Sequence, residues 1–298
     1  MSLDAAVLRR AARDGLVICG VLLGLAQATG LVAAPGDALA YYQARLADPY
    51  AHSTLAQGAG YLYSPAFAQA LQPLRLLPWP AFLVVWTSLL TLCLAYLAGP
   101  WGWPLLVVIP ILSSIGLGNI ELLIALAIVV GFRWPAAWAF VLLTKVTPGI
   151  GLLWFVFRGE WRRLAVALGA TGLLALVSFV LAPGLWVQWW DVLVRNTSVT
   201  FPEATFPGPL WLRLLVSAAL LFVAARLDWL WMVPIAAAIS TPVAYFTLLA
   251  VALPGAAAVL RRVRPVFVPS GQETLLEGRR GGRWSTLADR LLRPPEVA

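Results

Sequence analysis

The sequence predicts an all-α integral membrane protein of about ten hydrophobic segments, some of them paired in short hairpins, with two long loops on one side. Hydrophobic residues make up 61% of the 298 residues and charged residues only 11%, whereas soluble domains carry about 25% charge. A soluble core could not enclose this much apolar surface. The lipid bilayer is therefore the solvent for most of the chain.

The net charge of +8 does not by itself indicate a nucleic-acid partner. The basic residues lie between apolar segments, where they usually set membrane orientation, and do not form a stripe on a soluble face. The two cysteines, Cys19 and Cys93, both lie inside apolar runs. We therefore expect no nucleic-acid binding, no disulfide framework and no thiolate metal site.

The first segment covers residues 15–34 and follows Arg9, Arg10 and Arg13, as a signal peptide would. Its apolar stretch is longer than that of a signal peptide, and similar segments follow, so we expect an uncleaved first helix. A long mixed loop at 35–79 separates it from the second span at about 80–97.

Four shorter segments come next, at 103–115, 119–131, 135–145 and 148–157. Each is shorter than the roughly 20 residues that a full span requires. We expect two hairpins that reach partway through the bilayer. Their tips would be Gly116–Asn119 and Lys145–Pro148, where non-helical backbone is tolerated only beside protein or a watery cavity.

The predicted membrane domain covers residues 1–260. Its last part has a segment at 163–182, a second long loop at 183–208, and three further segments. These three cover residues 209–225, 229–239 and 242–259. Residues 261–298 form a basic tail. Within the tail, residues 283–293 are either a short amphipathic helix at the membrane surface or part of a disordered segment.

The distribution of basic residues predicts the orientation. With the N-terminus inside, 16 of the 21 lysines and arginines lie on the cytoplasmic side. The other five are Arg45, Arg75, Lys145, Arg195 and Arg213. The excess of basic residues on the inner side predicts cytoplasmic N- and C-termini, with both long loops and both hairpin tips outside.

Asp37 directly follows the first span, in the first outer loop. Partial desolvation there would raise its proton affinity and suit it to work as a general base. Alternatively, Asp37 caps a short helix that starts near Ala38.

The same loop contains Tyr41, Tyr42, Tyr61 and Tyr63. These tyrosines can stack on a sugar ring and hydrogen-bond to its hydroxyls. They can equally form an aromatic belt at the membrane surface. His52, the single histidine, could transfer a proton or bind a phosphate, or have no role in the site.

Glu121 and Lys145 each adjoin an apolar hairpin segment. An ionised group inside the membrane costs at least about 2.5–3.5 kcal/mol, so such a residue normally faces a cavity or has a partner. Lys145, or an arginine such as Arg75 or Arg195, could bind a phosphate. Lys145 could also simply extend to the membrane surface. No residues have metal-ligand spacing, and no Gly-rich nucleotide loop is present.

The ordered motifs resemble those of glycosyltransferase family 87, whose members have the GT-C fold. The first loop is similar in Asp37-(x3)-Tyr41-Tyr42, Pro49-Tyr50, Tyr61-x-Tyr63-Ser64-Pro65 and Pro73-Leu74. Two hairpin motifs also match, Gly118-Asn119-Ile120-Glu121-Leu122-Leu123 and Thr144-Lys145-Val146-Thr147-Pro148 with the basic turn Arg158–Arg163. Together these similarities cover residues 15–165.

The resemblance implies a GT-C-like bundle in a bacterial plasma membrane that transfers a hexose, typically mannose, from a polyprenyl-phosphate donor. A lipid or glycan would supply the acceptor hydroxyl. Asp37 matches the catalytic base of the family and Lys145 its hairpin lysine. Asn119, Glu121 and Arg195 are further candidates for substrate binding. The resemblance implies no metal and no cofactor beyond the lipid-linked sugar.

Two other functions fit the composition. A transporter or lipid flippase would place polar groups near the midplane of the membrane and show weak symmetry between its halves. A non-catalytic scaffold would tolerate replacement of both Asp37 and Lys145. We find no internal repeat, and the polar residues gather on one side, which favours the glycosyltransferase.

Overall fold

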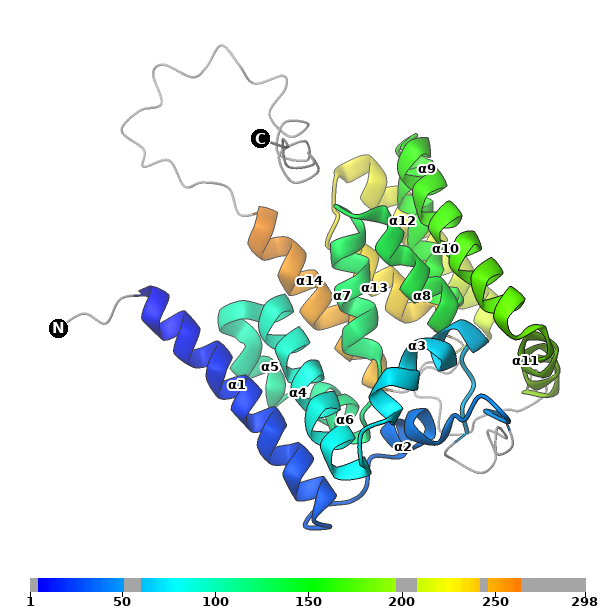
Figure 1. Ribbon diagram of the computed structural model, residues 1–298. Coiled ribbons are helices and arrows are strands. Elements are labelled where there is room, and N and C mark those ends of the chain that lie inside the picture. Colours follow the sequence, from blue (N-terminus) through cyan, green and yellow to red (C-terminus); the bar gives the residue numbers. More distant parts are fainter. Residues whose placement is uncertain (1–4, 51–59, 197–207, 242–245, 264–298) are drawn as a thin grey trace, which may run out of the picture.

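The computed structural model describes residues 5–50, 60–196, 208–241 and 246–263. Within these ranges every regular element is a helix, as the sequence predicts. Figure 1 shows a bundle of long helices with several shorter, broken ones between them.

Four helices are long and apolar enough to cross a membrane. They are α1 (Ala5–Ala28), α4 (Trp79–Ala98), α10 (Trp161–Leu181) and α12 (Leu210–Leu227). Helices α6 (Ile109–Leu117) and α7 (Glu121–Gly131) add a fifth candidate span, bent by 106°. The expected ten segments are therefore not ten spans: five candidate spans and shorter apolar helices make up the described bundle.

The shorter helices follow the hairpins that the sequence predicts. Two of them, α5 (Gly102–Leu106) and α8 (Trp138–Thr144), precede breaks, and α9 (Leu153–Phe157) ends the second hairpin. Single 3-10 turns extend them: η2 (Gly99–Trp101), η3 (Pro135–Ala137) and η4 (Thr147–Leu152). The bundle ends with α13 (Met232–Ile239), η5 (Phe246–Leu248) and α14 (Leu249–Val263).

Helix α7 lies at the centre of the bundle and is apolar on all sides, as a fully enclosed helix should be. Its residues Ile124, Ala125 and Ile128 have no exposed surface. It packs against α4, α8 and α14, which come from distant parts of the sequence. The first residue of this rigid helix, Glu121, is therefore held in a fixed position.

Helix α10 has the opposite character. Only 11% of its spanning window is buried, compared with 61% in α4. Leu173, Val180 and Leu181 are each more than half exposed. A helix that presents such side chains outward needs an apolar solvent, so α10 faces lipid.

Helices α1 and α4 approach each other closely through small residues. Gly20 and Gly24 face Thr87 and Thr91, and a Cβ atom added at Gly24 would lie 2.6 Å from Oγ1 of Thr87. The Thr87 hydroxyl donates to the carbonyl of Gly20 at 2.8 Å. Small residues spaced by four are typical of helix pairs that pack inside membranes.

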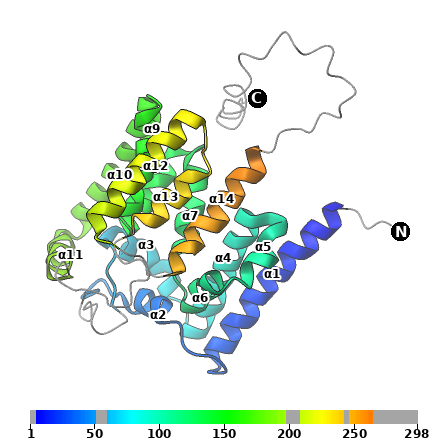
Figure 2. The ribbon, with the colours of Figure 1, turned by 180° about the vertical axis from the view of Figure 1, so that it is seen from behind.

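The two ends of the bundle differ in charge. One end, which we call the arginine end, holds the start of α1, the α7–η3, α9–α10 and α12–α13 turns and the end of α14 (Figures 1 and 2). The basic residues of the described ranges at this end are Arg9, Arg10, Arg13, Arg133, Arg158, Arg162, Arg163, Arg226, Arg261 and Arg262. The opposite end, the site end, holds α2 (Gly36–Gln43), α3 (Pro65–Arg75), α11 (Pro183–Asn196) and the α6–α7 break.

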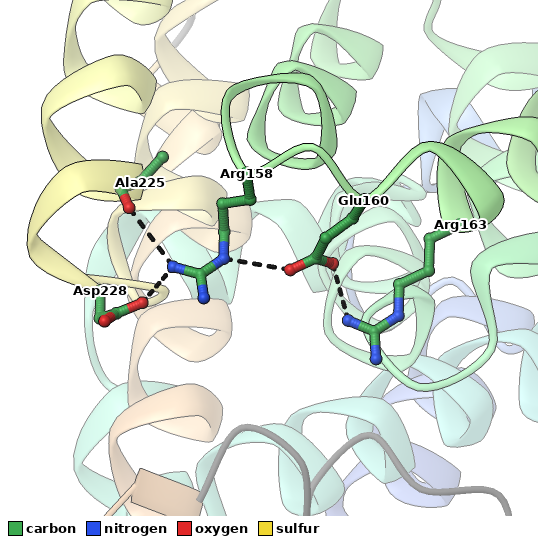
Figure 3. A network of polar contacts seen from close by, with 5 residues as sticks. All are labelled: Arg158, Glu160, Arg163, Ala225 and Asp228. Atoms are coloured by element: carbon green, nitrogen blue, oxygen red, sulfur yellow. Dashed lines mark hydrogen bonds and ion pairs between the residues drawn. The ribbon is translucent and has the colours of Figure 1, made fainter. Parts of the chain in front are cut away.

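A network of charged residues lies at the arginine end (Figure 3). Arg158 donates to Glu160 at 3.0 Å and forms an ion pair with Asp228. Glu160 also accepts a bond of 2.7 Å from Arg163. These contacts join the α9–α10 turn to the α12–α13 turn.

Several predicted boundaries were wrong. Helix α1 begins at Ala5 and ends at Ala28, ten residues earlier at its start than predicted. The predicted loop at 183–208 begins with a helix, α11, and the mixed loop at 35–79 contains α2 and α3. Helix α14 runs from Leu249 to Val263, four residues past the expected end of the last segment at 259. The expected tail helix at 283–293 lies outside the described residues.

Candidate active site

Asp37 lies in the first turn of α2, and its side chain does not act as the helix cap. The helix begins at Gly36, and the cap position is occupied by Pro35, which has no side-chain hydrogen bond. The Asp37 Oδ2 atom instead accepts a hydrogen bond of 2.8 Å from the Asn119 amide, 82 residues further along the chain. The capping alternative is therefore wrong, and Asp37 faces the break between α6 and α7.

The backbone at this break is fixed by buried contacts on several sides. Gly118 adopts the left-handed conformation with φ of 73°, and a Cβ atom there would lie 2.5 Å from Cβ of Ala38. Its carbonyl accepts a bond of 2.8 Å from the indole of Trp86. Gln27 donates to the carbonyl of Gly116 at 2.8 Å. Protein groups thus satisfy the backbone that the break exposes, as a membrane interior requires.

Lys145 follows the end of α8, in an extended conformation that ends the helix. Its Nζ atom lies 3.4 Å from Oε1 of Glu121. The same Glu121 oxygen accepts a hydrogen bond of 3.2 Å from the Thr247 hydroxyl in η5. The two predicted charged residues of the hairpins are therefore partners of each other.

Asp37 and Lys145 also interact electrostatically. Burial raises the pKa of Asp37 above its usual 3.8, and the opposing effects of Lys145 and of the Asn119 hydrogen bond offset part of this rise. Lys145 interacts in the same way with Tyr63 and Glu121. The structure thus brings together five predicted site residues, Asp37, Tyr63, Asn119, Glu121 and Lys145, which we call the polar cluster.

Two of the predicted tyrosines, Tyr41 and Tyr61, form a packed aromatic group beside this cluster and not a belt at the membrane surface. Tyr41 and Tyr61 are only 1% and 2% exposed, and their rings pack against Tyr63 and Phe67. The Tyr41 and Tyr63 hydroxyls share a hydrogen bond of 3.1 Å. Burial raises the pKa of Tyr63, so its hydroxyl is neutral beside Asp37 and Lys145.

The family comparison decides what kind of protein carries this cluster. The family model described as Glycosyltransferase family 87 matches residues 61–271, which is more than half of the chain. The chain belongs to glycosyltransferase family 87. It is therefore a membrane enzyme that transfers sugar, and this excludes the transporter and scaffold alternatives as its principal function. No curated protein and no solved structure gives a significant match.

The match to family 87 extends further towards the C-terminus than the motifs at 15–165 indicate, and it begins later. Asn119, Glu121, Lys145 and Arg195 lie within the matched range, and so do Tyr61 and Tyr63. Asp37, Tyr41, Tyr42 and His52 precede it. The hydrogen bond from Asn119 therefore links Asp37 to the part of the chain that the family model matches.

Two predicted residues, Arg195 and Tyr42, lie apart from the polar cluster of this family 87 enzyme. Arg195 is exposed in the last turn of α11, where its Nε donates to the carbonyl of Asp191 at 3.3 Å. Tyr42 packs against Trp79 and donates to the carbonyl of Leu77 at 3.0 Å. His52 lies outside the described residues.

Two hydroxyl residues that support the cluster were missed at the sequence level. Thr247 binds Glu121, and the fully buried Ser64 donates to the carbonyl of Leu143 at 2.5 Å. Ser64 therefore ties the first loop to the end of α8, two residues before Lys145. Ser64 could have been noticed because it precedes Pro65 in the family motif. Nothing in the sequence distinguishes Thr247 from the other threonines that lie in apolar segments.

An apolar cavity of about 350 Å³ adjoins the site, between α3, α8 and α10. Phe67, Phe140 and Leu174 line it, together with Thr144, the neighbour of Lys145. Leu174 is half exposed on the lipid-facing side of α10. The cavity therefore lies between the lipid-facing surface of the enzyme and the polar cluster.

Proposed function

We propose that this family 87 enzyme transfers a hexose, preferably mannose, from a polyprenyl-phosphate donor to an acceptor hydroxyl of a lipid or glycan. The observation that carries the proposal is the polar cluster itself, in which the Asp37 carboxylate, the Asn119 amide and the Lys145 ammonium group come together at the tips of two broken helices. Each group has a role in displacing a phosphate from a sugar.

Asp37 acts as the base. Its pKa is raised by burial, which increases its affinity for a proton, while Asn119 orients its carboxylate by a hydrogen bond of 2.8 Å. Asp37 takes the proton of the acceptor hydroxyl as the acceptor oxygen attacks the anomeric carbon. The bond from that carbon to the phosphate oxygen breaks, and attack from the opposite face inverts the configuration.

Lys145 binds the phosphate. The leaving polyprenyl phosphate carries negative charge, so a fixed cation stabilises it without a proton donor. The Lys145 side chain is 20% exposed, so the protein does not enclose it completely. Because Lys145 can hold the phosphate, the proposed reaction uses no metal or further cofactor. Tyr63, whose hydroxyl lies beside both charged groups, contacts the sugar.

The apolar cavity supports a lipid-linked donor. A polyprenyl chain is a hydrocarbon, and its transfer from lipid into a cavity lined by Phe67, Phe140 and Leu174 costs little because both environments are apolar. Thr144, the residue before Lys145, lines the cavity, so a chain lying in it would pass close to the end of α8 where Lys145 is placed. The donor would thus enter sideways from the membrane.

The charge asymmetry supports an outer-face reaction in a bacterial plasma membrane. Basic residues prevail in cytoplasmic segments, and ten of those in the described ranges lie at the arginine end. We therefore assign the arginine end, with both chain termini, to the cytoplasm and the site end to the outer face.

Replacement of Asp37 tests the proposal. The full chain, purified and reconstituted in liposomes, is given radiolabelled polyprenyl-phosphate mannose and a membrane lipid extract as a source of acceptors. We expect Asp37→Asn to transfer label at least about 100-fold more slowly, the usual effect of losing a general base. Asp191→Asn, which changes an exposed aspartate at the same end, should match the parent.

Transfer by Asp37→Asn at the parental rate would remove the proposed base. Parallel reactions with other polyprenyl-phosphate hexoses identify the sugar, and activity with a nucleotide sugar in their place would contradict the proposed donor class.

A further inference from the structure

Glu121 is the member of the polar cluster that the proposed reaction does not use. It is the first residue of α7, and its side chain is only 6% exposed. The N-terminal end of a helix favours a negative charge, so the carboxylate is stabilised where it lies. A sugar cannot reach a group so enclosed, and any role of Glu121 must pass through its neighbours.

The nearest of these neighbours is Lys145. The distance of 3.4 Å between its Nζ and the Glu121 carboxylate exceeds the roughly 2.7–2.9 Å of a strong charged hydrogen bond. The second carboxylate oxygen, Oε2, is buried and has no hydrogen-bond partner among the described residues. A buried ion pair is well stabilised only when such remaining positions are also satisfied. Glu121 therefore holds Lys145, but loosely.

A second carboxylate also acts on the same ammonium group. Asp37 interacts electrostatically with Lys145, and so does Tyr63. Without Glu121, Lys145 would have Asp37 as its remaining anionic partner in the cluster. Among the described residues Lys145 forms its ion pair with Glu121 and none with Asp37, so Asp37 competes less strongly than Glu121 for the ammonium group.

We propose that Glu121 is a positioning residue, which holds the Lys145 ammonium in the empty site and releases it to the phosphate of the lipid-linked donor. The proposal rests on the proposed function, because it requires a phosphate to reach Lys145. A phosphate monoanion or dianion accepts several hydrogen bonds from one ammonium group, so it displaces a loosely held carboxylate. When polyprenyl phosphate leaves, Lys145 returns to Glu121.

Binding of a polyprenyl monophosphate tests this exchange without requiring turnover. The purified full-length enzyme and its variants are titrated with this lipid in detergent, and the dissociation constant is measured. Glu121→Gln keeps the side-chain shape and can still accept the Thr247 hydroxyl, but it no longer competes for Lys145. We expect it to bind about tenfold more tightly, the effect of one charged hydrogen bond.

Three further variants locate the effect. Lys145→Met should bind about tenfold more weakly than the parent, and the double variant Glu121→Gln/Lys145→Met should resemble Lys145→Met. Glu160→Gln is the matched control, because Glu160 is also ion-paired to a basic residue but lies at the arginine end. It should leave binding unchanged. Glu121→Asp, which retains the charge but is shorter, should give a smaller gain in the same direction.

A folded Glu121→Gln enzyme that binds the lipid no more tightly than the parent would overturn the exchange. So would a gain that persists when Lys145 is absent, because the effect would then not pass through Lys145. Should Glu121→Gln fail to fold, an unchanged or weaker affinity in Glu121→Asp decides against it in the same way. If the parent binds no polyprenyl phosphate, the proposed donor itself is wrong.

Discussion

At the scale of single residues, burial and neighbouring charges together set the pKa of Asp37 in the polar cluster. Burial raises the pKa of Asp37, while Lys145 and the Asn119 hydrogen bond lower it, and the net effect is upward from 3.8. A raised pKa means that folding favours the protonated form, so the ionised carboxylate lowers stability at neutral pH. Asp37→Asn removes this cost, and we expect its thermal midpoint at pH 7 to equal or exceed that of the parent.

The pH dependence of activity follows from the same balance. Asp37 can accept a proton only when ionised, so kcat/KM should fall as the pH drops through its raised pKa. Asn119→Ala removes a hydrogen bond that lowers this pKa, and the acid limb should move upward by about one pH unit. Rates measured across the acid range in both proteins check this. An acid limb at the same pH in both would show that Asn119 does not act on the base.

At the residue scale, the sequence indicated the acid and the lysine but not their surroundings. The sequence placed Asp37 and Lys145 on the same side of the membrane, because the outer loop and the hairpin tip both face away from the basic cytoplasmic segments. The pairing of Glu121 with Lys145 and Thr247 depends on which helices pack together, and no local pattern encodes that packing. The sugar-stacking role assigned to Tyr41 and Tyr61 stays a prediction, and their burial leaves little ring surface for it.

At the scale of elements, the break between α6 and α7 joins the fold to the site. It contains Asn119, which it brings to α2, and it leads directly into Glu121 at the start of α7. The sequence predicted this break from the short apolar segments on either side of Gly116–Asn119. Helix boundaries were predicted less well, because the polar residues before position 15 continue α1 and the mixed composition of 183–196 conceals α11.

Gly118 should be essential for this arrangement. Its left-handed backbone costs other residues about 1–2 kcal/mol, and an added Cβ would press on Ala38, next to Asp37. We expect Gly118→Ala to displace α2 and to lower kcat by about tenfold or more, since small misplacements of a catalytic group have large effects. Gly116→Ala is the control, because a Cβ there has open space. Equal rates for the two variants, measured in the liposome assay, would contradict this role.

At the scale of the whole molecule, the enzyme has an arginine end and a site end. This asymmetry is the basis for proposing that the reaction takes place on the outer face of the membrane. A cysteine test can establish it. In a Cys19→Ser/Cys93→Ser background, Leu46→Cys reports on the site end, where Leu46 is 38% exposed after α2. Trp161→Cys reports on the arginine end, where Trp161 is 61% exposed at the start of α10. Both positions are accessible once the membrane is open, so any difference between them reflects sidedness.

The expected pattern follows from the positive-inside rule. A membrane-impermeant maleimide should label Leu46→Cys in intact spheroplasts and Trp161→Cys only after permeabilisation. The reverse pattern would make the polar cluster face the cytoplasm, where nucleotide sugars are also present. Because the cavity, Lys145 and the base would keep their geometry in either orientation, this measurement decides which pool of substrates the cluster meets.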